Sequence, residues 1–129
     1  MAYVDIVTML ALLQFIVFGM HVGRARSKYG VHAPAITGNE IFERHFRVQQ
    51  NTLEQLVVLL PGLYLFAHYV NAFAAAGLGA IYLIGRQIYS ASYVRDPKTR
   101  SAGFGLSFLP ILILLVGGLI GAAIHLARS

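Results

Sequence analysis

Long runs of apolar residues, separated by short polar stretches, make up most of this chain. Four of them reach or approach the ~20 residues that a helix needs to cross a bilayer; they occupy residues 4–23, 50–70, 72–93 and 103–127. The second run lies within a helix that we expect to begin near Glu40, with Glu40 and Glu43 as its acidic first turn. The pattern predicts an all-α fold, an integral membrane four-helix bundle in which residues 1–129 form one domain.

The boundaries of the runs predict how the helices connect. The second and third runs are joined by almost nothing, at Tyr69, Val70 and Asn71, so these two helices should form a tight antiparallel hairpin. Pro61 and Pro110 fall inside runs and should kink their helices, which membrane helices tolerate.

Polar residues interrupt the apolar runs at helical spacing and form two stripes. Positions four, seven and eleven residues apart return to nearly the same side of an α-helix. The first stripe contains Arg47, Asn51 and Glu54, and the second contains Tyr82, Arg86, Tyr89 and Tyr93. Because an ionisable residue inside a membrane helix is costly, each stripe is a candidate functional site.

Composition supports the membrane assignment and excludes several kinds of site. Hydrophobic residues make up 57% of the chain and charged residues only 12%, against about 25% charged in soluble domains. There is no cysteine, which excludes disulfides and thiolate sites. The five histidines show no paired ligand spacing, so we expect no metal site. The first run lacks a basic flank and a cleavage site, which predicts a retained helix instead of a signal peptide.

The basic residues gather on one side of the predicted bundle. Of the ten Lys and Arg residues, only Arg128 falls on the other side. The positive-inside rule therefore predicts that the basic side is cytoplasmic and that both termini are not. The net charge of +5 then reflects topology, with anionic membrane lipids as partners, and we expect no nucleic-acid partner.

The residue types in the stripes leave two interpretations open. A buried polar network could hold the bundle together, with Arg47 paired to Glu54, and the tyrosines could form an interfacial aromatic belt. Alternatively, the stripes form a binding site, because the arginines near them outnumber the carboxylates. The groups counted are Arg47, Arg86, Arg95, Arg100, Glu54 and Asp96. Such a site would suit a ligand with several anionic groups and one cation. A lone protomer would leave Arg47 and Arg86 facing lipid or each other, so a neighbour should enclose them.

Three separated motifs resemble the MAPEG family, the membrane-associated proteins of eicosanoid and glutathione metabolism. They are ARSKYGVHAP at residues 25–34 followed by Thr37 and Gly38, EIFERHFRVQQNTLE at residues 40–54, and YLIGRQIYSASY at residues 82–93 followed by Arg100. Within that family, the motifs are most similar to the branch of leukotriene C synthase and the microsomal glutathione transferases.

The resemblance implies a homotrimer that binds glutathione, as a co-substrate, between protomers near the cytoplasmic face. The residues implied to hold glutathione are Arg26, Arg47, Gln49, Asn51, Glu54, Tyr89 and Tyr93. The residues implied to be catalytic are Arg100, near the sulfur, and Tyr93, as a hydrogen-bond donor beside it. Gln55 and Ser27 stand where a tyrosine and a second arginine occur in the family. These departures favour a broader glutathione transferase or peroxidase, active in detoxification, over leukotriene synthesis.

The second substrate implied is a hydrophobic electrophile or a lipid hydroperoxide that enters from the bilayer. The rival interpretation is a non-catalytic lipid-binding adaptor similar to the 5-lipoxygenase-activating protein. Retention of Arg47, Asn51, Glu54, Tyr93 and Arg100 favours the enzyme. A small transporter has little support, because the chain shows no clear inverted repeat. The short termini, without a retention signal, favour a bacterial inner membrane over the endoplasmic reticulum.

Overall fold

The computed structural model describes all residues 1–129 and contains four long helices and one short 3₁₀ helix. They are α1 (Ala2–Tyr29), α2 (Glu40–Tyr69), α3 (Ala72–Arg95), η1 (Pro97–Thr99) and α4 (Ser101–Ala127). The all-α prediction is confirmed. Helices α1, α3 and α4 each contain one of the predicted apolar runs, and α2 contains the run 50–70 except for its last residue, Val70.

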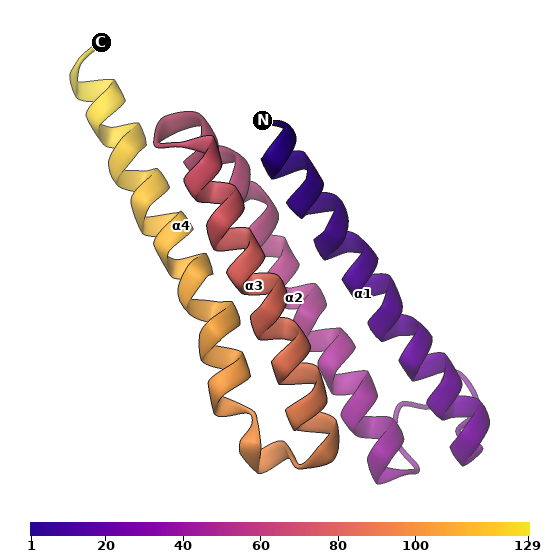
Figure 1. Cartoon of the computed structure of the whole chain (residues 1–129). Coiled ribbons are helices and arrows are strands. Elements are labelled where there is room, and N and C mark those ends of the chain that lie inside the picture. Colours follow the sequence, from indigo (N-terminus) through magenta and orange to yellow (C-terminus); the bar gives the residue numbers. More distant parts are fainter.

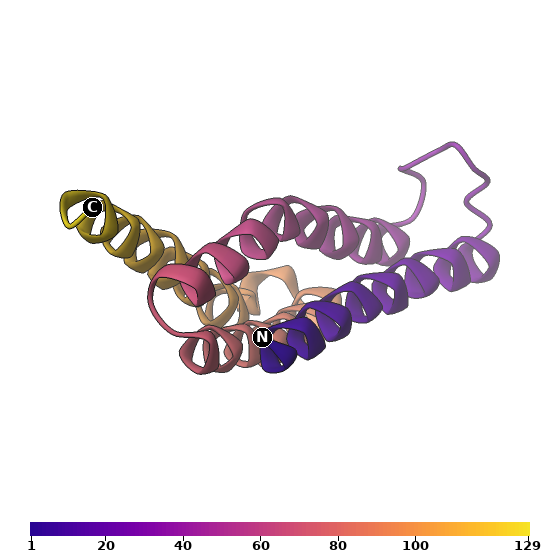
Figure 2. The same ribbon diagram turned by 90° about the horizontal axis from the view of Figure 1, so that it is seen from above.

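The helices run antiparallel to their sequence neighbours, with α2 and α3 in the middle. Helix α1 packs against α2 and α3, and α4 packs against the same two helices from another side. Both termini lie at the end that contains the α2–α3 turn, and the α1–α2 and α3–α4 connections lie at the opposite end (Figure 1). The C-terminal part of α4 projects away from the other helices (Figure 2). The predicted tight hairpin of α2 and α3 is confirmed.

Local sequence explains where the helices begin and end. The side-chain oxygen of Asn39 accepts a hydrogen bond from the Phe42 N–H (3.0 Å), which caps α2 ahead of its predicted acidic first turn. Asn71 caps α3 in the same way through the Ala74 N–H (2.8 Å). Gly30 ends α1 at φ 67°, a left-handed conformation that glycine adopts at little cost. Pro61 and Pro110 both lie inside helices that continue past them.

The core of the bundle is apolar, and so is much of its surface. Leu59, Leu63, Ala75 and Leu114 are at most 1% exposed, whereas large apolar side chains of α1 and α4 point outward along both helices. Helices α1 and α4 are long and apolar enough to cross a membrane, with mean hydropathy 2.0 and 2.4 over an apolar stretch of 18 residues in each. Charged residues in α2 and α3 lower their hydropathy, so spanning by these two helices stays a prediction.

Two glycines let α3 and α4 approach each other closely at the end that carries η1. A Cβ on Gly103 would lie 2.3 Å from the backbone nitrogen of Tyr89, and one on Gly85 would lie 2.5 Å from that of Ser107. Any larger residue would therefore push the helices apart. This contact fixes the start of α4, and with it Arg100, beside α3.

Candidate functional site

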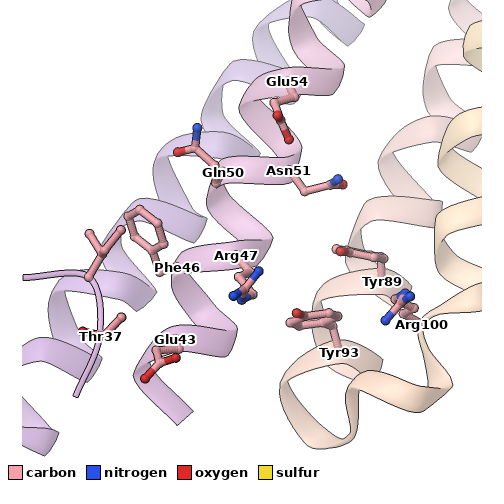
Figure 3. Close-up of a pocket in the computed structure, with 11 residues that line it drawn as sticks. Thr37, Glu43, Phe46, Arg47, Gln50, Asn51, Glu54, Tyr89, Tyr93 and Arg100 are labelled. Atoms are coloured by element: carbon pink, nitrogen blue, oxygen red, sulfur yellow. The ribbon is translucent and has the colours of Figure 1, made fainter. Parts of the chain in front are cut away.

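A polar pocket of about 480 Å³ opens at the end of the bundle that carries the α1–α2 and α3–α4 connections. One wall comes from α2, and the facing wall comes from α3 and the start of α4 (Figure 3). Six of the eight residues implied to bind or activate glutathione line it together: Arg47, Asn51, Glu54, Tyr89, Tyr93 and Arg100. Residues 53 positions apart in the chain therefore share one site.

On the α2 wall, Arg47, Asn51 and Glu54 follow one another along the helix, as the first stripe predicts. The Asn51 side-chain oxygen is buried and has no hydrogen-bond partner within the chain, so it can accept a donor from a ligand. The structure does not contain the Arg47–Glu54 pair that the buried-network interpretation would require. The one ion pair in the structure joins Arg44 to Glu40 (2.6 Å). Arg47 and Glu54 therefore both remain available to a ligand.

On the facing wall, two phenol rings and one guanidinium converge. The rings of Tyr89 and Tyr93 stack with centroids 5.5 Å apart. Arg100 immediately precedes α4, where the helix dipole adds positive potential. A second hollow of about 470 Å³ shares Asn51, Tyr89 and Arg100 with the pocket and continues along α4 to Phe104. The two hollows thus meet at the same three side chains.

Arg86 does not face lipid or a neighbouring protomer, and the expectation that it would is wrong. Its side chain is 0% exposed and donates hydrogen bonds to Thr52 Oγ1 (2.7 Å), Gln55 Oε1 (3.0 Å) and Ser107 Oγ (3.3 Å). Its guanidinium also lies 4.3 Å from the centroid of the Tyr89 ring. The buried-network interpretation therefore holds for Arg86, because neutral oxygens of α2 and α4 accept from both of its terminal nitrogens, whereas its buried Nε has no partner.

The second stripe consequently divides into two parts. Tyr82 and Arg86 are fully buried inside the bundle, whereas Tyr89 and Tyr93 reach the pocket. The sequence analysis missed the partners of Arg86. The signal was present, because Thr52 and Gln55 are three residues apart and share a face of α2.

The pocket also contains residues that the sequence analysis did not assign to it. Glu43 and Gln50 extend the α2 stripe at spacings of four and three residues around Arg47. Glu43 also accepts a hydrogen bond from the Gly38 N–H (3.2 Å), which holds the α1–α2 loop near the pocket. With Glu43 included, two arginines and two carboxylates line the pocket. The expected surplus of arginine is therefore wrong for this pocket within one protomer.

Arg26 and Gln49, the other two residues implied by the motifs, lie outside the pocket. Arg26 donates to the Ala35 carbonyl (2.7 Å), and its guanidinium stands 4.7 Å from the centroid of the Phe42 ring. Gln49 points to α1, because its amide nitrogen is the nearest side-chain atom to a Cβ built on Gly19 (3.0 Å). Within one protomer, these two side chains therefore belong to the α1–α2 packing.

The fold and the pocket define a class: an apolar helical bundle that holds a polar, zwitterionic site at one end. Comparison with known proteins shows to which family this class of protein belongs. The model of the MAPEG family matches residues 4–120, and the chain belongs to that family. Its members are membrane proteins, in agreement with the apolar character of α1 and α4.

Several relatives cover most of the chain. An uncharacterized protein of Synechocystis sp. is 51% identical over 115 residues, which is 89% of this chain and 84% of the relative. Human microsomal glutathione S-transferase 2 is 38% identical over 117 residues, or 91% of this chain and 80% of the relative. Leukotriene C4 synthase of Cavia porcellus is 34% identical over 119 residues, or 92% and 79% of the two chains.

Proposed function

We propose that this protein is a membrane-bound glutathione S-transferase that adds the glutathione thiolate to a hydrophobic electrophile. The observation that carries the proposal is the convergence of Arg47, Asn51, Glu54, Tyr89 and Arg100 on one pocket. Membership of the MAPEG family and the similarity to a microsomal glutathione S-transferase support it. The same residues argue against a purely lipid-binding adaptor, which would have no use for a charged pocket.

The charges of the pocket fit the charges of glutathione. The tripeptide carries two carboxylates, one ammonium and one thiol. Glu54 would bind the ammonium, and Arg47 would bind a carboxylate through its planar fork of N–H donors. The unpartnered oxygen of Asn51 would accept from the ammonium or from a peptide N–H of the ligand. Tyr89 and Tyr93 would close the opposite side.

A homotrimer would complete this site. One protomer supplies two arginines and two carboxylates to the pocket, which leaves the second carboxylate of glutathione without a cation. Arg26 and Gln49 lie outside the pocket of their own protomer, so in a trimer they would reach the pocket of a neighbour. Arg26 would then supply the missing positive charge.

Arg100 would activate the thiol. A free thiol of this kind has a pKa of about 8.5, and only its thiolate attacks. Arg100, reinforced by the dipole of α4 and by a hydrogen bond from Tyr93, would favour the anion. The thiol proton would leave to water, so no side-chain base is required. The thiolate would then form the new carbon–sulfur bond and the electrophile would release its leaving group or, in an addition, take up a proton from water.

The electrophile would arrive from the membrane. The second hollow meets the pocket at Asn51, Tyr89 and Arg100 and continues to Phe104 and Gly105 of α4, an apolar helix. A substrate dissolved in the bilayer would thus reach the sulfur without crossing water. We propose a bacterial inner membrane, with the pocket on the cytoplasmic side, because the basic loops lie at that end.

Glutathione binding by a Glu54→Gln variant tests the proposal. Loss of one partner of a desolvated charged pair costs on the order of 2–5 kcal/mol of binding free energy, so calorimetry should show a large loss of affinity. Glu40→Gln is the matched control, because Glu40 pairs with Arg44 outside the pocket. If the parental protein bound lipid but no glutathione, the function would be that of a non-catalytic lipid-binding adaptor and the enzyme proposal would fail.

A further inference from the structure

A third hollow, separate from the proposed glutathione pocket and from the hollow along α4, lies between α1 and α2. Its volume is about 230 Å³, and it is lined by His21, Arg24, Ala25, Lys28, Tyr29, Ile41 and His45. The α1 residues at 21, 24 and 28 follow at spacings of three and four, so they share one face of the helix. His45 lies two residues from Arg47, which puts it on another side of α2 from the stripe of the glutathione pocket.

The side chains of this hollow stand close together although they are mostly basic. Apart from Tyr29, every titratable side chain that faces the hollow from α1 and α2 is basic. The rings of His21 and His45 meet edge to face, with centroids 5.9 Å apart. The Lys28 ammonium lies 5.4 Å from the centroid of the Tyr29 ring. Four groups that carry or can acquire positive charge therefore surround one small space.

Nothing in the protein balances this charge. No carboxylate lines the hollow. The two acids at the start of α2 are engaged elsewhere, since Glu40 pairs with Arg44 and Glu43 accepts from the Gly38 N–H. Burial lowers the pKa of His45, and the neighbouring His21 lowers it further. A bound anion would relieve this repulsion and favour the charged imidazole.

We propose that this hollow is a binding site for a phosphate group. Arg24 offers a planar fork of donors, Lys28 a compact ammonium, and the two histidines further N–H donors, a set that suits an oxyanion with several acceptor oxygens. The hollow lies at the basic end of the bundle, beside the α1–α2 loop, where a phosphate group could come from a lipid headgroup or from solution. This site does not depend on glutathione binding.

The experiment compares two doubly substituted proteins that lose the same charge. Arg24→Gln/Lys28→Gln removes two exposed cations of the hollow that donate no hydrogen bond within the chain, and Arg95→Gln/Lys98→Gln removes two exposed cations from the α3–α4 end outside it. Calorimetry of detergent-solubilised protein with inorganic phosphate measures the free anion. Native mass spectrometry after extraction from vesicles of phosphatidic acid and phosphatidylcholine measures retained lipid.

The first variant should lose at least about tenfold in affinity for the anionic ligand, and the second should keep the parental affinity. Loss confined to inorganic phosphate identifies a soluble phosphate or phosphate ester as the ligand. Loss confined to retained phosphatidic acid identifies a lipid headgroup. Equal binding by the two variants, or no binding of either ligand by the parental protein, would overturn the proposal.

Discussion

In the proposed mechanism, single side chains decide whether this pocket is reactive or merely charged, and Arg100 is the clearest case. Among the residues of the pocket it alone comes from the start of α4, where side chain and helix dipole favour an anion together. Lys98, two residues earlier, is also exposed and basic but lies outside the pocket. Variants of these two residues can therefore distinguish an effect of Arg100 on the glutathione sulfur from an effect of the general positive charge of the loop.

We expect Arg100→Ala to raise the pKa of the glutathione thiol by about 1–3 pH units, since an opposite charge nearby shifts a pKa by this amount. The thiolate would then form at higher pH, and turnover near neutral pH should fall. Thiolate absorbance in the ultraviolet, titrated with glutathione bound, measures the pKa directly.

Lys98→Ala is the matched control for this titration and should leave both the thiol pKa and the rate unchanged. An Arg100→Ala protein with the parental pKa and rate would remove Arg100 from the mechanism. Arg26 and Arg47 would then be the remaining cations to examine.

At the scale of helices, the position of Arg100 depends on the contact between α3 and α4. Gly103 lies against the backbone of Tyr89, and Gly85 lies against the backbone of α4 at Ser107. The absence of two side chains therefore brings the phenols of α3 and the guanidinium of α4 into one pocket. The site is built by backbone proximity as well as by its polar residues.

Gly103→Ala should accordingly reduce thermal stability, by about 1–3 kcal/mol for an overpacked contact, and weaken glutathione binding. A methyl group there would displace the start of α4 from Tyr89. Thermal unfolding in detergent and calorimetry with glutathione measure the two effects.

Gly77→Ala is the control, because a Cβ at Gly77 meets nothing within 4 Å. Alanine is the better helix former, so this variant should be as stable as the parent or more so. If Gly103→Ala behaved like Gly77→Ala, the close contact of α3 and α4 would not be needed for the site.

Helical periodicity predicted much of the site but could not predict the partners within the bundle. Arg47, Asn51 and Glu54 emerged from spacing because polar side chains on an apolar helix are conspicuous. Arg86 and Tyr89 have the same spacing signal and both are buried, yet only Tyr89 lines the pocket. The difference depends on how α2 and α4 pack against α3, which spacing within one helix does not encode.

For the whole molecule, the arrangement of the helices carries a prediction about topology. Both termini lie at one end and both basic connections at the other (Figure 1). If all four helices cross the membrane, the positive-inside rule predicts that the termini lie outside the cytoplasm. Because the protein has no native cysteine, a thiol reagent can label only the cysteine that is introduced. Ala2→Cys should react with a membrane-impermeant thiol reagent on intact cells, and Lys98→Cys should not. The reverse labelling would invert the orientation.

Assembly can be tested through the site itself. If Arg26 of one protomer completes the pocket of its neighbour, Arg26→Ala and Arg47→Ala proteins should each lose glutathione turnover. Their co-expression should restore a fraction of it, because some pockets then combine an intact Arg26 with an intact Arg47. Mass measurement in detergent should give a trimer. An active monomer, or no restoration by mixing, would contradict the shared site.

The burial of Arg86 has a consequence for how the chain enters a membrane. Its hydrogen-bond partners Thr52 and Gln55 belong to α2, and Val70 and Asn71 alone link α2 to α3. Entering lipid by itself, α3 would carry an unsatisfied guanidinium at a cost of about 2.5–3.5 kcal/mol if it sat near the bilayer centre. Entry as a preformed hairpin supplies the acceptors at once. Biogenesis should therefore proceed by insertion of α2 and α3 as one unit, with Ser107 of α4 joining afterwards.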